Sequence, residues 1–563
     1  MDRPRASIWL SLLERPDGAV RRRLVDVYGN DGSVIQERTA LLRRALRVYL
    51  ARFGDDRVRV FRAPGRLNLR GMHVDTHGGY LNLMTHHRET VVVGAPSNGS
   101  RCVLINVDPD YEEVAFDRAE AAGALARART WEQMLQDPET RRRVSAQPGH
   151  WGNYVRGTLL RAEQARRGPA SRGLRAVVGG DLPSGAGLSS SHALCTALLY
   201  AALGLTETPM KDEERILAVR DAEWYAGARS GVSDQGAMVL CRRGELVNAA
   251  LFAPDLDLRS ARRLEFPDAV CVLVIHSHTR RSLSGAHLVE YTRNRFAYSL
   301  AMDIVRREME RQGAPAEFSI RVDRLARLTP EHLEPIGGLR ALYGLLRAIP
   351  ESLEIDELRR RYAPAQFEAL YDQYFGSTAP EDRPVRIALR GPLLFGIAES
   401  ERAQVFFDLL AEGDFTSAGR LMTLGHEGDR RIGPDGRPVQ QDISDARLAR
   451  AEAEATPVEL LAGDYGASSP ALDVLVDAAV AGGALGASLT GAGIAGSVLA
   501  LCRRQDAERV AQRVRARMRA PDYHELAGRP APIADGDIEN AVVVNRAISG
   551  AGELVMGHGT IRM

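Results

Sequence analysis

The hydrophobic positions of this chain follow two different spacings, and together they predict both strands and helices. Short apolar runs, the pattern of buried strands, occur at residues 58–63, 91–95, 103–107, 174–178, 237–241, 270–276 and 498–501. Longer stretches with helical spacing and few breakers cover residues 192–203, 214–228 and 288–310. This mixture is typical of an α+β fold.

Two further apolar segments need an interpretation. Near the N-terminus, an amphipathic pattern is formed by Leu41, Leu42, Ala45, Leu46, Tyr49 and Leu50, as expected for a helix that docks on a larger body. The uncharged stretch 478–502 is long enough to span a bilayer. Its glycines and hydroxyl residues instead favour a buried helix, a glycine loop and a strand.

Composition narrows the class of protein further. The 563 residues are 45% hydrophobic and 26% charged, the ordinary balance of a globular protein with room for two or more domains. A net charge of +1 gives no electrostatic argument for binding nucleic acid or a membrane. The five cysteines are scattered, and the apolar run near the N-terminus stops at Glu14, so we expect no signal peptide. We therefore expect a cytoplasmic protein with reduced cysteines.

One segment has the composition of a loop that cradles phosphate. It reads Pro183-Ser184-Gly185-Ala186-Gly187-Leu188-Ser189-Ser190-Ser191 and lies between a predicted strand and a predicted helix. Glycines let a backbone approach an anion closely, and the amides at a helix start point toward it. Serine hydroxyls add neutral donors and can ligate Mg²⁺. The segment therefore predicts a site for a nucleoside triphosphate.

Lysine is almost absent, which excludes two common kinds of nucleotide site. Lys211 is the one lysine among the 74 basic residues. A Walker A loop requires a lysine directly after its last glycine, and a protein kinase requires one on a strand. Phosphate chemistry in this chain must therefore use arginine, serine, backbone amides and a metal ion.

Three glycine-bearing segments occur in an order that points to one family. The first is Ala63-Pro64-Gly65-Arg66-Leu67-Asn68-Leu69-Arg70-Gly71-Met72-His73-Val74-Asp75, the second is the loop at 183–191, and the third is Leu489-Thr490-Gly491-Ala492-Gly493-Ile494-Ala495-Gly496. Together they resemble the GHMP small-molecule kinases, and most closely the galactokinase group. The resemblance implies a two-lobed α+β fold with the active site in the cleft between the lobes. It also implies ATP-dependent phosphorylation of a monosaccharide, with Mg²⁺, at the anomeric hydroxyl.

The resemblance covers residues from about 45 to 320 and from about 385 to 563. It divides the chain into an N-terminal extension (1–44), an N-terminal kinase domain with the phosphate loop (45–265) and a C-terminal kinase domain (266–563). Within the last, residues at about 320–380 are charged, helical and interrupted by prolines. We expect them to form an inserted helical subdomain outside the shared core. The oligomeric state does not follow from the sequence.

The matched positions imply a role for each candidate residue. Asp234 is the expected base that accepts the sugar hydroxyl proton, and Arg66 is expected to keep it ionised and to stabilise developing charge. Mg²⁺ is expected at Ser191 and Glu223. ATP is expected at Pro183, Gly185, Ala186, Gly187, Leu188, Ser189, Ser190 and Ser191, and the sugar at His73, Asp75, Tyr291, Gly491 and Gly493.

Each assignment has a simpler alternative. Asp234 can cap a turn, Glu223 can be a solvated carboxylate on a helix, and His73 can be an ordinary loop residue. Tyr291 also fits the edge of a core. The glycines of the third segment fit close packing without any ligand.

Four positions depart from the family pattern, and one of them is Thr76, which stands where an aromatic residue is common. Met72 stands where the group usually has glutamate, so we expect at least one sugar hydroxyl contact to be lost, which leaves the identity of the sugar open. His192 replaces the usual alanine directly after the phosphate loop, and Ala495 replaces a glycine. A catalytically weak or inactive sensor of sugar and ATP is therefore the alternative to a kinase. Retention of Asp234 and of the three serines favours the enzyme.

Overall fold

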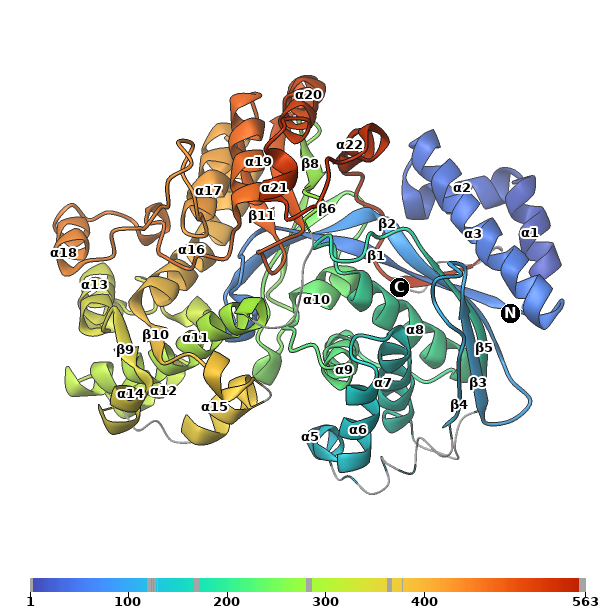
Figure 1. Cartoon of the computed structure of the whole chain (residues 1–563), viewed down its shortest axis with the longest axis horizontal. Coiled ribbons are helices and arrows are strands. Elements are labelled where there is room, and N and C mark those ends of the chain that lie inside the picture. Colours follow the sequence, from blue (N-terminus) through green and yellow to red (C-terminus); the bar gives the residue numbers. More distant parts are fainter. Residues whose placement is uncertain are drawn as a thin grey trace.

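The computed structural model describes residues 4–118, 123, 125, 128, 130–166, 172–279, 286–361, 367–376 and 378–555. Helices and strands are mixed, as the α+β prediction requires, and they form two lobes (Figure 1). The helices are α1 (Ala6–Glu14), α2 (Gly18–Tyr28), α3 (Gly32–Phe53), α5 (Trp131–Gln136), α6 (Pro138–Ala146), α7 (Trp151–Gln164), α8 (Ser190–Thr206), α9 (Asp212–Tyr225), α10 (Ser233–Leu240), α11 (Ala286–Arg311), α12 (Ala316–Arg321), α13 (Gly338–Ala348), α14 (Ile355–Arg361), α15 (Phe367–Phe375), α16 (Arg390–Glu412), α17 (Phe415–Glu427), α18 (Asp445–Ala453), α19 (Pro470–Ala481), α20 (Ala507–Met518), α21 (Tyr523–Leu526) and α22 (Asp535–Ala541).

The strands belong to one sheet in each lobe and to a small additional pair. They are β1 (Arg59–Arg70), β2 (Tyr80–Pro96), β3 (Arg101–Asn106), β4 (Val114–Asp117), β5 (Leu174–Gly180), β6 (Glu245–Ala250), β7 (Arg262–Glu265), β8 (Val270–His276), β9 (Ser352–Glu354), β10 (Arg386–Ala388), β11 (Gly486–Thr490), β12 (Ser497–Arg503), β13 (Val542–Val544) and β14 (Gly552–Leu554).

Within the described residues, the N-terminal sheet has the strand order β14-β1-β2-β5-β3-β4, and β6 and β7 extend it from β2. Its strands pair antiparallel except for β3 and β5, which are parallel. Because β14 pairs with β1, residues 552–554 belong to this sheet. This pairing corrects the predicted C-terminal domain, which extended to residue 563.

The two faces of the N-terminal sheet are covered by different helices (Figure 1). Val60, Val91 and Val93 pack into a cluster with α1, α2 and α3. Phe61 and Val92, one position along their strands, pack on the other face with residues of α7, α8 and α9. This alternation is the two-residue period of a strand buried on both faces.

The amphipathic segment near the N-terminus forms the second half of α3 and docks on this sheet as predicted. The four residues Leu42, Ala45, Leu46 and Tyr49 are fully buried in the cluster with the strands. The N-terminal extension is therefore part of the lobe's core.

The C-terminal sheet has the order β11-β12-β8-β13, entirely antiparallel, and contains the predicted strands at 270–276 and 498–501. A cluster that includes Leu67 and Leu188 from the N-terminal lobe and Leu499 and Phe406 from the C-terminal lobe joins the two halves. None of the described helices is long and apolar enough to cross a membrane. The stretch 478–502 instead contains the end of α19 and the hairpin of β11 and β12.

Two predicted elements are corrected by the structure. Residues 237–241, predicted as a strand, lie mainly in helix α10, because a run of five apolar residues does not distinguish a short strand from a buried helical turn. The first glycine-bearing segment was expected to leave the strand at Pro64. Strand β1 instead continues to Arg70, and shifts in register at Pro64/Arg66 and Asn68/Arg70 accommodate the proline and glycine.

The region at about 320–380 contains α12 to α15 and is helical as expected, but it is not separate from the shared core. Leu325, Leu342 and Phe375 belong to the same buried cluster as Phe395 of α16 and Leu489 of β11. Burial of these apolar side chains requires the rest of the lobe.

Candidate functional site

The segment at 183–191 connects β5 to α8 through a loop of left-handed backbone. Gly185 and Gly187 have φ of +73°, and Ser189, the residue before the helix, has φ of +62°. Apart from its neighbours in the chain, no atom of the described residues lies within 4 Å of the position that a Cβ on Gly185 would occupy. The first amides of α8 have no partner within the helix. The loop therefore offers the glycine backbone, the helix start and the serines that a phosphate requires.

The three glycine-bearing segments meet at the junction of the two lobes. The backbone N–H of Arg66 donates to the carbonyl of Leu188 at 3.4 Å. The hydroxyl of Thr490 donates to the carbonyl of Asn68 at 3.2 Å. A Cβ on Gly491 would lie 3.1 Å from the Gly187 oxygen, so the third segment packs directly on the phosphate loop. Segments separated by hundreds of residues thus form one site.

Asp234 lies in the first turn of α10 and forms an ion pair with Arg66 of β1. The Nε of Arg66 donates to Oδ1 of Asp234, and its Nη1 donates to the carbonyl of Gly187. Burial raises the pKa of Asp234, but the charges of Arg66 and His192 outweigh burial and hold that pKa well below its usual range. Asp234 is therefore ionised at neutral pH, and one guanidinium links it to the phosphate loop.

Glu223 lies on α9 and is 1% exposed. Burial raises its pKa, while His192 and the Ser191 hydroxyl act in the opposite direction. The carboxylate and hydroxyl are hard oxygen donors that suit Mg²⁺, which usually takes one or two protein ligands and completes its shell with phosphate and water. No group of three or more histidine, cysteine, aspartate or glutamate side chains suited to a metal occurs among the described residues. As hard oxygen donors, the Glu223 carboxylate and the Ser191 hydroxyl fit a metal held jointly with a nucleotide.

His192, the residue that departs from the family pattern, lies between the two carboxylates. Its Nδ1 is 3.2 Å from Oδ2 of Asp234 and 3.5 Å from Oε1 of Glu223. The side chain is buried in the first turn of α8. The sequence marked His192 as unusual but gave no indication that it contacts both acids.

The predicted sugar-binding residues are only partly brought together. Asp75 is next to the base, because Ser233 donates to Oδ2 of Asp75 from its backbone N–H at 3.2 Å and from its hydroxyl at 2.9 Å. His73 has φ of +63°, and its ring stacks on Tyr465 at 4.5 Å with Nε2 3.5 Å from Oδ1 of Asp429. The side chain of Tyr291 lies outside the described residues.

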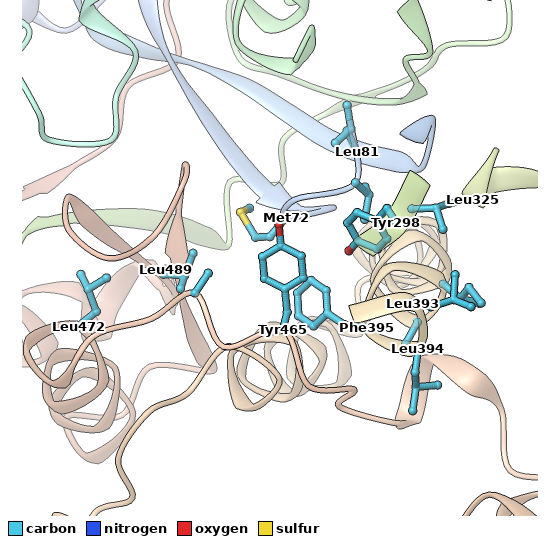
Figure 2. Packing of buried hydrophobic residues seen from close by; sticks show 14 of the residues in the cluster. Met72, Leu81, Tyr298, Leu325, Leu393, Leu394, Phe395, Tyr465, Leu472 and Leu489 are labelled. Carbon is cyan, nitrogen blue, oxygen red and sulfur yellow. The ribbon is translucent and has the colours of Figure 1, made fainter. Parts of the chain in front are cut away.

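Met72 is 1% exposed and packs into the large hydrophobic cluster of the C-terminal lobe. Figure 2 shows it beside Tyr465, on the side of the cluster that also contains Leu489. Its backbone N–H donates to Oε1 of Glu399 at 3.1 Å, and Glu399 in turn pairs with Arg70. The Met72 thioether is thus part of an apolar core, and the buried carboxylate next to it is that of Glu399.

The two glycines predicted to contact substrate have different surroundings. Gly491 contacts the phosphate loop, as described above. A Cβ on Gly493 would lie 2.1 Å from the carbonyl oxygen of Ala467, so Gly493 is required for close packing within the C-terminal lobe. Ala495 is buried, and its neighbour Gly496 packs on Ala186 of the loop.

Sequence reasoning missed several residues that complete the site. Ser233 contacts Asp75 and lies 3.5 Å from Oδ1 of Asp234. Asp429, just after α17, and Tyr465, after α18, contact His73. Serine beside the aspartate was the available signal for Ser233. Nothing local in the sequence links Asp429 or Tyr465 to His73.

The chain matches three family models, described as GHMP kinases N terminal domain over residues 153–242, GHMP kinases C terminal over residues 439–520, and galactokinase galactose-binding signature over residues 47–96. A galactokinase of Chloroflexus aggregans (strain MD-66 / DSM 9485) is 27% identical over 468 residues, which is 82% of this chain and 88% of that relative. A galactokinase of Roseiflexus sp. (strain RS-1) is 26% identical over 476 residues, which is 84% of this chain and 90% of that relative.

A solved structure shares the fold. Lactococcus lactis galactokinase complexed with galactose matches with a TM-score of 0.58 and 18% identity, over 90% of this chain and 97% of that chain. This likeness confirms the predicted fold class.

Proposed function

We propose that this chain, which matches the GHMP kinase N-terminal and C-terminal family models and is similar to galactokinases, transfers the terminal phosphoryl group of ATP to a monosaccharide. Relatives named galactokinase align with more than four-fifths of the chain. We take the anomeric hydroxyl as the acceptor because the resemblance to that group implies it. Because Met72 stands where the galactokinase group usually has glutamate, galactose is one candidate substrate among several sugars.

In the proposed mechanism, Asp234 orients the acceptor hydroxyl and accepts its proton as the new P–O bond forms. The transition state of phosphoryl transfer is loose, so positioning and charge neutralisation contribute more than a strong base does. This requirement suits Asp234, whose pKa lies well below its usual range. Arg66 contacts both Asp234 and the Gly187 carbonyl, so it fixes the base relative to the loop that receives the phosphates.

Mg²⁺ would be held by Glu223 and Ser191. When bound with the nucleotide, the ion supplies neutralisation of the charge on the phosphate oxygens. The helix start at Ser190 and the left-handed glycines bind and orient the phosphates through backbone amides. Asp75 would hold a sugar hydroxyl, and its contact with Ser233, the residue before the base, supports this role.

The observation that carries the proposal is the bridge that Arg66 makes between Asp234 and the phosphate loop. It is tested by an ADP-release assay with the purified protein, ATP and MgCl₂ over a panel of free sugars that includes galactose, other aldohexoses, 6-deoxy sugars and pentoses. At least one sugar should stimulate ADP release. Its product should lose the reducing-sugar reaction, because a phosphate on the anomeric hydroxyl closes the ring permanently.

Two other results would contradict parts of this proposal. Calorimetric binding of ATP and of a sugar, with no ADP formed from any member of the panel, would indicate the sensor and not the kinase. A product that keeps its reducing end would contradict the anomeric acceptor while leaving the kinase assignment in place.

A further inference from the structure

The N-terminal helices contact the chain immediately before the phosphate loop through an ion pair between the buried Arg38 and the partly exposed Asp181. Arg38 of α3 is 2% exposed, and its guanidinium pairs with both carboxylate oxygens of Asp181, with Nη1 donating to Oδ1 at 2.9 Å. Asp181 lies just after β5 and two residues before Pro183, the first residue of the loop. A bidentate pair fixes orientation as well as distance.

A second acid, the buried Glu89, contacts Asp181 as well. The backbone N–H of Glu89 donates to Oδ1 of Asp181 at 2.9 Å, and the N–H of Asp181 donates to the carbonyl of Glu89 at 3.3 Å. The fully buried Glu89 carboxylate accepts from the hydroxyl of Tyr28 on α2 at 2.8 Å and pairs with Arg62 of β1. Helices α2 and α3 thus both reach the residues that anchor the loop.

The anchor is continuous with the catalytic elements. Leu182, the next residue, packs against Gly65, where an added Cβ would lie 2.4 Å from its side chain. Gly65 directly precedes Arg66, whose N–H donates to Leu188 at the far end of the loop. A displacement of Asp181 would therefore be transmitted to both ends of the loop and to the base.

We propose that the N-terminal helical segment, residues 4–53, fixes the phosphate loop for ATP through the Arg38–Asp181 pair, with Arg38 as a positioning residue. The proposal rests on the proposed function, since it assigns ATP to this loop. The helices α1 and α2 lie in the part of the chain outside the family resemblance, and this contact gives that extension a role in the site. Arg38 acts through Asp181 and does not itself contact substrate.

The test compares Arg38→Met with a matched control, Arg44→Met, on the same helix. Arg44 donates to the carbonyl of Val107, just after β3, and among the described residues it has no hydrogen bond or ion pair with Asp181 or the loop. The measured quantities are the dissociation constant of a non-hydrolysable ATP analogue with MgCl₂, the KM values for ATP and sugar, kcat, and hydrogen exchange of peptides covering residues 182–192.

We expect Arg38→Met to weaken binding of the ATP analogue on the order of tenfold to a hundredfold, because small displacements of a positioning group have effects of this size. The KM for sugar should change little, and exchange across 182–192 should accelerate. Arg38→Lys, which keeps the charge but not the bidentate geometry, should restore part of the affinity. Arg44→Met should leave nucleotide affinity and exchange of the loop as in the native chain.

A double variant separates positioning from stability. Arg38→Met with Asp181→Leu removes both partners of the ion pair and leaves no carboxylate without its counter-charge, so it should regain thermal stability lost in the single variant. The proposal requires nucleotide affinity to stay weak in the double variant. Recovery of both properties, or native affinity in Arg38→Met, would overturn it. A native chain that binds no nucleotide would instead refute the proposed function.

Discussion

Replacement of Asp234 by asparagine is the most direct test of the proposed base. The substitution keeps the shape and an oxygen acceptor for Arg66, but it removes the negative charge and the ability to accept the sugar proton. General bases contribute about 10²- to 10⁴-fold to rate, which corresponds to about 2.7–5.4 kcal/mol of barrier. We therefore expect kcat to fall by that factor.

The effect on folding should be smaller. Arg66 keeps its bond to the Gly187 carbonyl, and the Asp234 side chain is 17% exposed. The lost charge-assisted hydrogen bond should cost about 1.5–3 kcal/mol. ATP affinity should be nearly unchanged, because the loop amides and serines are untouched. The assay combines coupled ADP release with calorimetric titration of ATP and a urea unfolding curve.

Asp221→Asn is the matched control. Asp221 is a buried acid on α9 that pairs with Arg161 and Arg220 without contacting the phosphate loop. Its variant should lose stability and keep kcat. If Asp234→Asn retains kcat within about tenfold of the native value, Asp234 is not the general base.

Three further outcomes are expected. Gly491→Ala and Gly413→Ala should each cost about 1–2 kcal/mol of stability, because both glycines have φ near +83°. Only Gly491→Ala should weaken ATP binding, because its Cβ would press on the phosphate loop. None of the described atoms lies within 4 Å of the position of a Cβ on Gly413. Burial and nearby arginines lower the pKa of His87 to about 4, so the free energy of unfolding should fall by about 1.4 kcal/mol per pH unit for this residue as pH drops from about 6.5 toward 4. His87→Gln should flatten that acid limb in urea titrations at several pH values. Met72→Glu should lower the free energy of unfolding measured in urea by several kcal/mol, because it buries a second carboxylate beside Glu399. Met72→Leu should lower it by less than about 1.5 kcal/mol, and equal losses in the two variants would contradict this reasoning.

The sequence predicted the parts of the fold and site that depend on local chemistry. The strand at 270–276 is confirmed with the same bounds, because a β-branched run between turn residues has few alternatives. The loop at 183–191 is found between a strand and a helix for the same reason: glycines and serines have local conformational and hydrogen-bonding preferences. Arg66 and Asp234 are separated by 168 positions, so local patterning could not predict their contact. That contact was expected from the resemblance alone.

The remaining features depend on tertiary structure, which apolar patterning does not specify. The apolar run at 237–241 is compatible both with a buried strand and with the buried side of α10, and only tertiary packing determines which of the two forms. The region at 320–380 shows helical patterning, but that patterning does not identify the surface on which the helices pack. The contact of His73 with Asp429 and Tyr465 joins distant segments, so no spacing in the sequence reveals it.

The pairing of β14 with β1 has a consequence for how the protein is made. The Arg59–Glu553 ion pair, which accompanies this pairing, spans 494 positions. At ordinary translation rates of about 5–20 residues per second, that interval takes roughly 25–100 s. During this time the outer edge of β1 has unpaired backbone groups, and such edges associate readily with other chains. The lobe that is synthesised first is therefore among the last to be completed, and the nascent chain depends on protection of this edge until its final strand leaves the ribosome.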